Sequence, residues 1–116
     1  MIKEILKKLK DTEGVLAIIL TNKEGSLLYS ISNLVISPEI LSGLTASLAG
    51  LSDEILQELK MGKLKNTILN GTMGRLIISS LNNENILFVS VDNTENIELI
   101  ESVLSNTIKD LNKTNY

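Results

Sequence analysis

The chain has 116 residues, 43% of them hydrophobic, which is enough for one domain with a single core. It contains no cysteine and no histidine, so disulfides, thiolate ligands and the usual proton shuttle near neutral pH are excluded. With a net charge of −3, two tyrosines and one phenylalanine, it lacks the basic, stacking surface that nucleic acids require. We therefore expect no nucleic-acid partner, no metal site and no cofactor.

No segment has the character of a membrane span. The longest apolar run, residues 15–20, is far shorter than the ~20 residues that cross a bilayer as a helix. Lysines interrupt the first ten residues, so a secretory signal peptide is not expected there. We expect a cytoplasmic protein that does not insert into membranes.

The first third of the chain is predicted to form a helix and a β-hairpin. Apolar residues recur at helical spacing over residues 2–11. Residues 15–20 are typical of a central strand that is buried on both faces. A turn at 22–25, in which Gly25 is free to take a positive φ, leads into a second strand over 27–31.

The long helix in the middle of the chain has well-marked ends. Ser37 is a favoured N-cap residue, Pro38 suits the first helical position, and Glu39 complements the positive end of the dipole. Gly62 follows the last helical residues and is expected to end the helix. These signals predict a helix over residues 37–60.

Two stripes run along this middle helix. The large apolar stripe is expected to pack against the core and consists of Leu41, Leu44, Leu48, Leu51, Ile55 and Leu59. The small stripe consists of Gly43, Ala46, Ser47 and Gly50. Because a glycine within a helix costs about 1 kcal/mol relative to alanine, the small stripe indicates the close approach of another backbone. That backbone belongs either to the protein's own sheet or to a second chain, and we favour the second chain.

The last half of the chain is predicted to form three strands and a helix. The strands cover residues 64–70, 75–81 and 85–91, and short polar or glycine-rich turns join them as hairpins. The first is the most polar and fits a sheet edge, whereas the last is apolar on both faces and fits the middle. A final helix is expected to begin within residues 92–95, with Asp92 and Glu95 or Thr94 at its cap.

The predicted order of elements is α-β-β-α-β-β-β-α. Hairpin connections make the sheet mostly antiparallel. The fold class is therefore α+β, with a five-stranded sheet and helices on its faces, in one domain over residues 1–116.

These elements resemble the Roadblock / dynein light chain family over nearly the whole chain. Four features carry the resemblance: Gly14-Val15 at the first strand with Gly25 closing its hairpin, the middle helix rich in leucine, alanine and glycine, the turn around Gly71 and Gly74 before Arg75-Leu76-Ile77-Ile78, and Leu87-Phe88-Val89-Ser90-Val91-Asp92 before a helix near Asn96-Ile97.

The resemblance implies a dimer that binds another protein. Members of the family form homodimers or heterodimers in which the middle helices pack together and the strand after that helix pairs with its twin. Such dimers are platforms for small Ras-like GTPases, regulators of their nucleotide cycle, or cargo-linking subunits of dynein. Applied to this chain, it places an interface on Gly43, Ala46, Ser47 and Gly50 of the helix and on Lys65, Thr67, Ile68 and Leu69 of the strand.

Other candidates for function have simpler explanations. Arg75, the only arginine, is interpreted as an exposed turn residue rather than as a finger reaching a GTPase's phosphates. The glycine-rich turn at 71–74 lacks the lysine of a phosphate-binding loop. Asp53, Glu54 and Glu58 fit a solvated helix face, and the edge strand itself could remain solvated, protected by Lys65.

The leading hypothesis is a homodimeric scaffold that binds a small Ras-like GTPase and is not an enzyme. A sensor domain that holds a small ligand between sheet and helix is the alternative, although pockets of that kind usually have aromatic walls. A dynein-type adaptor subunit is a further alternative.

Overall fold

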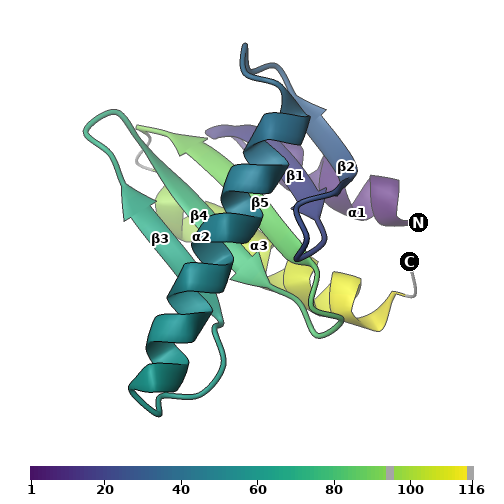
Figure 1. The fold of residues 1–116 in the computed structure, drawn as a ribbon. Helices are drawn as coiled ribbons and strands as arrows, with labels where there is room; N and C mark the ends of the chain where they lie inside the picture. Colours follow the sequence, from purple (N-terminus) through teal and green to yellow (C-terminus); the bar gives the residue numbers. More distant parts are fainter. Residues whose placement is uncertain (94–95, 115–116) are drawn as a thin grey trace.

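The computed structural model describes residues 1–93 and 96–114. Its elements, in chain order, are α1 (Ile2–Lys10), β1 (Val15–Thr21), β2 (Leu27–Ser32), α2 (Pro38–Glu58), β3 (Asn66–Asn70), β4 (Gly74–Ser80), β5 (Ile86–Asp92) and α3 (Ile97–Lys113) (Figure 1). The order and the α+β class are as the sequence predicts.

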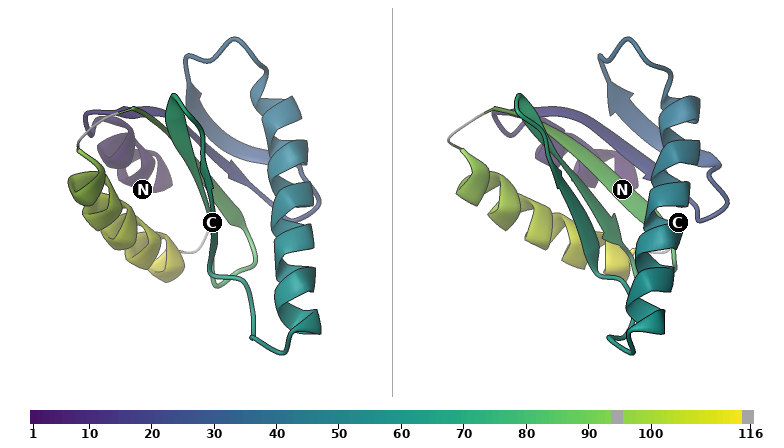
Figure 2. Two further views of the ribbon diagram at one scale, coloured as in Figure 1. Left: turned by 90° about the vertical axis from the view of Figure 1, so that its left-hand side faces the viewer. Right: turned by 60° about the vertical axis from the view of Figure 1, so that its left-hand side comes forward.

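The strands of the described residues form one sheet in the order β2-β1-β5-β4-β3, and every neighbouring pair is antiparallel. The apolar β5 lies in the middle and the polar β3 lies at an edge, which confirms both predictions. α2 covers one face of the sheet, whereas α1 and α3 lie together on the other (Figures 1 and 2). The molecule is therefore a three-layer sandwich.

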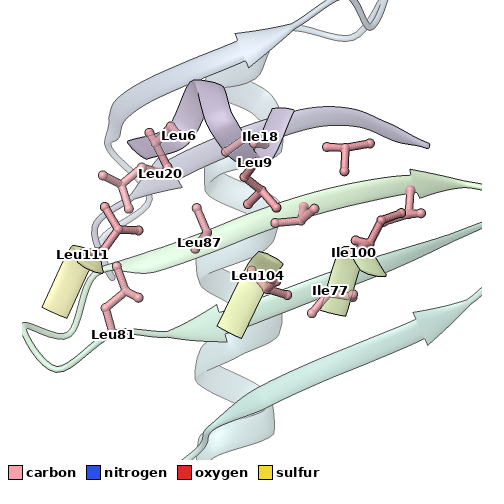
Figure 3. Close-up of a cluster of buried hydrophobic side chains, with 13 residues drawn as sticks. Leu6, Leu9, Ile18, Leu20, Ile77, Leu81, Leu87, Ile100, Leu104 and Leu111 are labelled. Atoms are coloured by element: carbon pink, nitrogen blue, oxygen red, sulfur yellow. The ribbon is translucent and has the colours of Figure 1, made fainter. Parts of the chain in front are cut away.

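The larger core lies between the sheet and the pair α1 and α3 (Figure 3). The amphipathic faces predicted for these two helices are the buried ones, because leucines and isoleucines at helical spacing meet alternate residues of three strands. Its most completely buried members are Leu6, Leu9, Ile18, Leu20, Leu87, Val89, Ile100 and Leu111.

The α2 side of the sheet has a thinner core. Ala49 of α2 packs in one cluster with Ile78 and Ile86, and Leu41 contacts a second cluster that includes Phe88. The residues of α2 that are fully buried are small or short: Ser42, Thr45 and Ala49. Their size lets the helix lie close to the strands beneath it.

The prediction that the large apolar stripe of α2 packs into the core is wrong for most of its members. Leu44, Leu51, Ile55 and Leu59 are exposed, whereas Leu41 and Leu48 are partly buried. The physical reason is steric. A helix that lies close to a sheet turns its small side chains toward the sheet. One of these, Ser42, is polar, but its buried hydroxyl donates a hydrogen bond to the Pro38 carbonyl at 2.8 Å and is therefore satisfied.

The predicted start of α2 is confirmed, whereas its end comes earlier than predicted: the helix ends at Glu58, and Lys60 rather than Gly62 is the first residue with a positive φ after it. The Ser37 side chain accepts a hydrogen bond from the Ile40 amide at 3.1 Å, and Pro38 is the first helical residue. Beyond the helix, Lys60 and Gly62 have positive φ values of 57° and 88°, which turn the chain back toward β3.

The predicted start of the last helix is too early. Asp92 is the final residue of β5, where it pairs with Gly74 and donates its amide to the Gly14 carbonyl at 2.8 Å. α3 begins at Ile97, with Asn96 at the N-cap position. The alternative caps, Thr94 and Glu95, lie outside the described residues.

Candidate protein-interaction surface

The outward side of α2 carries a continuous row of large apolar residues, here called the outer α2 ridge: Ile40, Leu44, Leu51, Ile55 and Leu59. Each of the five is 57–60% exposed. Spacings of four and seven residues place them on one face of the helix. Single exposed leucines are ordinary on protein surfaces, but a contiguous apolar row is typical of an interaction site.

The strand β3 presents the second part of this surface. It pairs with β4 in regular register, and its other side is a sheet edge. Ile68 and Leu69 are both 46% exposed and, as neighbours in a strand, point to opposite faces. Residues 66–70 include neither a charged residue nor proline, which are the usual protections of an edge.

The opposite edge strand, β2, differs from β3 in this respect. Its pairing with β1 shifts register between Leu20 and Thr21, where Leu28 is left out of the Cα pairing. A bulge of this kind twists an edge and hinders further pairing. The contrast makes β3 the better edge for adding a strand from another chain.

The eight residues that the sequence assigns to an interface lie in three environments. Ser47, Gly50, Lys65, Ile68 and Leu69 are exposed. Gly43 and Thr67 are partly buried, and Ala46 packs against the cluster around Ala49. The exposed members flank the outer α2 ridge or lie on the β3 edge. Their assignment to an interface stays a prediction.

The glycines of α2 have no packing requirement within the described part of the chain. A Cβ added at Gly43 or Gly50 would meet no described atom within 4 Å. The close backbone approach occurs from the turn, since a Cβ added at Gly25 would lie 3.1 Å from the Cα of Gly43 and 3.6 Å from the Cβ of Ala46. The β1–β2 turn therefore lies close to two members of the small stripe, Gly43 and Ala46.

A groove of about 1190 Å³ lies between the second half of α2 and the strand ends beneath it. Ala46, Ala49 and Gly50 form part of its wall, so small side chains create the space. Asp53 stands within it and accepts hydrogen bonds from the Leu64 amide and the Gln57 side chain, which hold the segment after α2 in place.

An ion pair bridges two turns at the rim of this groove. Lys23 lies 2.9 Å from Glu84, joining the β1–β2 turn to the β4–β5 turn. The ammonium group holds the pKa of the Glu84 carboxyl below its usual value, and the carboxylate raises the pKa of Lys23. Both side chains are exposed, so the pair contributes little to stability.

The interpretation of Arg75 as an exposed turn residue is wrong. Arg75 lies within β4, is partly buried, and its Nη1 is 3.1 Å from Oε1 of Glu101 on α3. It therefore ties a strand to the helix on the face opposite α2. The sequence offered no sign of this pairing, because the partners are distant in the chain and meet only in the folded sheet.

The outer α2 ridge is the feature that sequence reasoning misassigned. The predicted large apolar stripe includes four of the five ridge residues but not Ile40, and the same pattern fits a core or an interface between chains. Ser42 and Thr45 are buried on the opposite side of the helix, which shows that this opposite side is the one that faces the sheet.

Among the helices of the described residues, none has the length and apolar character of a membrane span.

An antiparallel sheet, with a long helix on one face and two helices on the other, defines the class of small α+β domains with the Roadblock fold. The Roadblock/LC7 domain model matches residues 1–90 of the chain. The chain belongs to the Roadblock/LC7 family.

Individual relatives are distant in sequence but close in structure. An uncharacterized protein of Methanocaldococcus jannaschii, MJ0310, is 27% identical over 100 residues, which are 86% of this chain and 87% of that protein. Myxococcus xanthus MglB superposes with a TM-score of 0.90 at 19% identity, covering 97% of this chain and 92% of MglB. A Roadblock/LC7 domain from Streptomyces avermitilis gives 0.84 at 12% identity, covering 93% and 92%. These two structures show the shared fold.

Proposed function

We propose that the chain is a homodimeric scaffold that binds a small Ras-like GTPase in the cytoplasm and alters its nucleotide cycle or its location. The observation that carries this proposal is the outer α2 ridge next to an unprotected sheet edge. A surface of this kind is unfavourable in water and is stabilised when a partner covers it.

Dimer formation accounts for both parts of the surface. Pairing of β3 with its counterpart would satisfy the free backbone groups of the edge and continue the sheet. The outer α2 ridges of the two chains would then supply the apolar contacts that carry most of the binding energy. A specific interface of this type buries roughly 1,200–2,000 Å² in total.

Membership of the Roadblock/LC7 family supports a GTPase as the further partner, as the resemblance implies. The composition supports regulation without covalent chemistry of its own, since the chain contains no histidine or cysteine. The scaffold would act by binding one conformation of the GTPase more tightly than another and so shifting its populations.

The experiment is a binding titration with a Ras-like GTPase encoded in the same genome. The GTPase is loaded with GDP or with a non-hydrolysable GTP analogue, and binding is followed by calorimetry. We expect saturable binding that differs between the two nucleotide states, and no binding of either nucleotide to the scaffold alone. Tight binding of GTP by this chain itself would contradict the proposal.

The groove beside Asp53 favours a second candidate, a sensor domain that holds a small ligand between α2 and the sheet. Its volume is sufficient. Against this candidate, the described residues that line the groove include no aromatic side chain. A thermal-shift screen of metabolites distinguishes the sensor domain from the scaffold. Ligand stabilisation that Gly50→Leu abolishes would support a sensor, whereas no shift with any compound leaves the scaffold as the function.

A further inference from the structure

The positive charge of the chain is concentrated in α1. This helix holds one acidic residue, Glu4, and four lysines: Lys3, Lys7, Lys8 and Lys10, a net charge of +3. Of the 11 basic and 14 acidic residues of the whole chain, seven basic and thirteen acidic residues then remain for all other segments, a net charge of −6. One basic helix on an otherwise acidic domain is typical of a surface that meets an anionic partner.

The lysines of α1 lie on its outer side. At about 100° per residue, Lys3, Lys7 and Lys10 fall within roughly 60° of the helix circumference. Lys3 and Lys7 are exposed and Lys10 is partly buried, whereas Leu6 and Leu9 on the opposite side are buried in the larger core. None of the four lysines of α1 forms an ion pair with a residue that the structure describes. Their charges are therefore available to a partner.

The end of α3 adds to this basic surface. The start of α3 is tied to the segment after α1, because the Asn96 side chain donates a hydrogen bond to the Glu13 carbonyl at 3.0 Å. From there α3 runs back, so that its last turns lie toward the N-terminus of the chain (Figure 1). Its last turns hold two exposed lysines and one aspartate, Asp110. The lysines of both helices are here called the basic helix face: Lys3, Lys7, Lys8, Lys10, Lys109 and Lys113.

Acidic residues limit the basic helix face at one end only. Asp11 and Glu13 follow α1, and Glu98 lies in the first turn of α3, all at the end away from the N-terminus. Within α1, the Glu4 carboxylate is 2.8 Å from the α-amino group of Met1, so it offsets that charge rather than the charge of a lysine. The face is therefore most positive over the first turns of α1 and the last turns of α3.

We propose that the basic helix face docks the protein on a membrane surface that contains anionic phospholipids. A membrane is planar and touches one side of the molecule, whereas a nucleic acid or an acidic protein that reached past the face would meet the negative remainder of the chain. All six cations are lysines, which act as flexible point charges and suit many mobile phosphate groups. The only arginine, Arg75, is paired with Glu101 and offers no fork to a fixed phosphate.

Docking of this kind is electrostatic and needs no insertion into the bilayer. Leu6 and Leu9 are fully buried, so the apolar side of α1 stays in the core of the protein. Each lysine near an anionic lipid surface strengthens binding roughly fivefold. The attraction falls off over about 8 Å at physiological ionic strength. Binding therefore needs several lysines of the face at once and weakens steeply as salt is added.

The inference goes beyond the proposed function, and one step rests on the proposed homodimer. α1 and α3 lie on the face of the sheet opposite α2 (Figures 1 and 2). If two copies join their sheets and bring their α2 helices together on one face, both α1 helices must lie on the other face. The two basic helix faces then point in one direction and meet one membrane together. The α2 side of the dimer would remain directed away from the lipid, open to a further protein.

Co-sedimentation with vesicles tests the proposal. Vesicles of equal parts phosphatidylglycerol and phosphatidylcholine are compared with vesicles of phosphatidylcholine alone. At low salt we expect the native chain to bind the first kind and not the second. At about 0.5 M salt, where the screening length is about 4 Å, the bound protein should be released.

A pair of double variants locates the binding surface. Lys3→Gln with Lys7→Gln should lower the partition coefficient for the anionic vesicles by about 20-fold, because two lysines of the face are lost from each chain. Lys60→Gln with Lys63→Gln is the matched control, since it removes the same charge from exposed positions after α2 and should bind as the native chain does. Circular dichroism checks that both variants are folded.

Each outcome decides a different part. A native chain that sediments as a dimer but does not bind anionic vesicles at low salt would overturn this inference and leave the proposed function standing. Equal losses in the two double variants would overturn the assignment to α1. Tighter binding to duplex DNA or to polyglutamate than to the vesicles would overturn the membrane as the partner. A native chain that binds the vesicles as a monomer would support docking through α1 and overturn the proposed homodimer.

Discussion

Gly25, in the turn between β1 and β2, lies against Gly43 of α2, so close that a Cβ on Gly25 would come within 3.1 Å of the Cα of Gly43. Gly25 also has a φ of 88°, which side chains disfavour. The missing side chain at Gly25 lets the β1–β2 turn lie directly against the first half of α2.

Gly25→Ala should destabilise the fold, measured as the free energy of unfolding in urea. The positive φ alone costs about 1–2 kcal/mol, and the overlap with Gly43 adds to it. Gly62→Ala is the matched control, because Gly62 has the same φ of 88° but meets no described atom within 4 Å. Equal losses for the two variants would show that the contact with Gly43 contributes nothing.

Gly50→Ala should stabilise a single chain, because alanine favours a helix over glycine by about 1 kcal/mol and nothing described lies near the added methyl group. The measurement is urea unfolding in a background that carries Leu51→Glu, which is designed to be monomeric. In the otherwise native chain, weaker dimerisation by Gly50→Ala would place the small stripe at the interface. Unchanged dimerisation would leave the small stripe without a role between chains.

Leu69→Lys should weaken the dimer through the β3 edge, because a lysine there opposes strand pairing. We expect a rise of about tenfold in the dimer dissociation constant, or ~1.4 kcal/mol. Leu28→Lys on β2 is the control, since Leu28 is exposed to a similar degree, 44% against 46%. If sedimentation shows equal weakening by both variants, β3 is not the paired edge.

Arg75→Ala should leave GTPase regulation unchanged, because Arg75 is bound to Glu101 on the face opposite α2. The partly exposed ion pair is worth less than about 1 kcal/mol, so the fold should tolerate its loss. Single-turnover hydrolysis by the partner GTPase, with native scaffold or with the variant, is the measurement. A large drop in the hydrolysis rate with the variant would support the hypothesis that Arg75 acts as an arginine finger on the GTPase.

Much of the fold was predictable because its signals are local. Ser37 and Pro38 mark the start of α2 through the hydrogen bonding of its first turn, and the polarity of residues 64–70 marks an edge strand. Asp92 was assigned to a helix cap because its preference for caps is also local, whereas pairing with Gly74 keeps it in β5.

The candidate surface was predictable only in part, because it depends on contacts between distant segments. Periodicity groups Leu44, Leu51 and Ile55 on one face without stating whether that face meets the sheet or another chain. The choice is made by Ser42, Thr45 and Ala49, whose small size suits the close packing beneath α2. Nothing in the local sequence of Arg75 or Glu101 indicates that they pair.

The measurement that tests the central claim most directly is sedimentation equilibrium of the native chain beside Leu51→Glu, with Leu99→Glu on α3 as the control. Leu51 and Leu99 are both exposed, so neither change should unfold the chain, and circular dichroism checks this. We predict twice the 12.7 kDa chain mass at micromolar concentration for the native chain and for Leu99→Glu. Leu51→Glu should sediment as a folded monomer, with a dissociation constant raised about 100-fold or more, equivalent to ~2.7 kcal/mol. A native chain that sediments at 12.7 kDa, or a Leu51→Glu variant that dimerises as tightly as the native chain, would contradict the account.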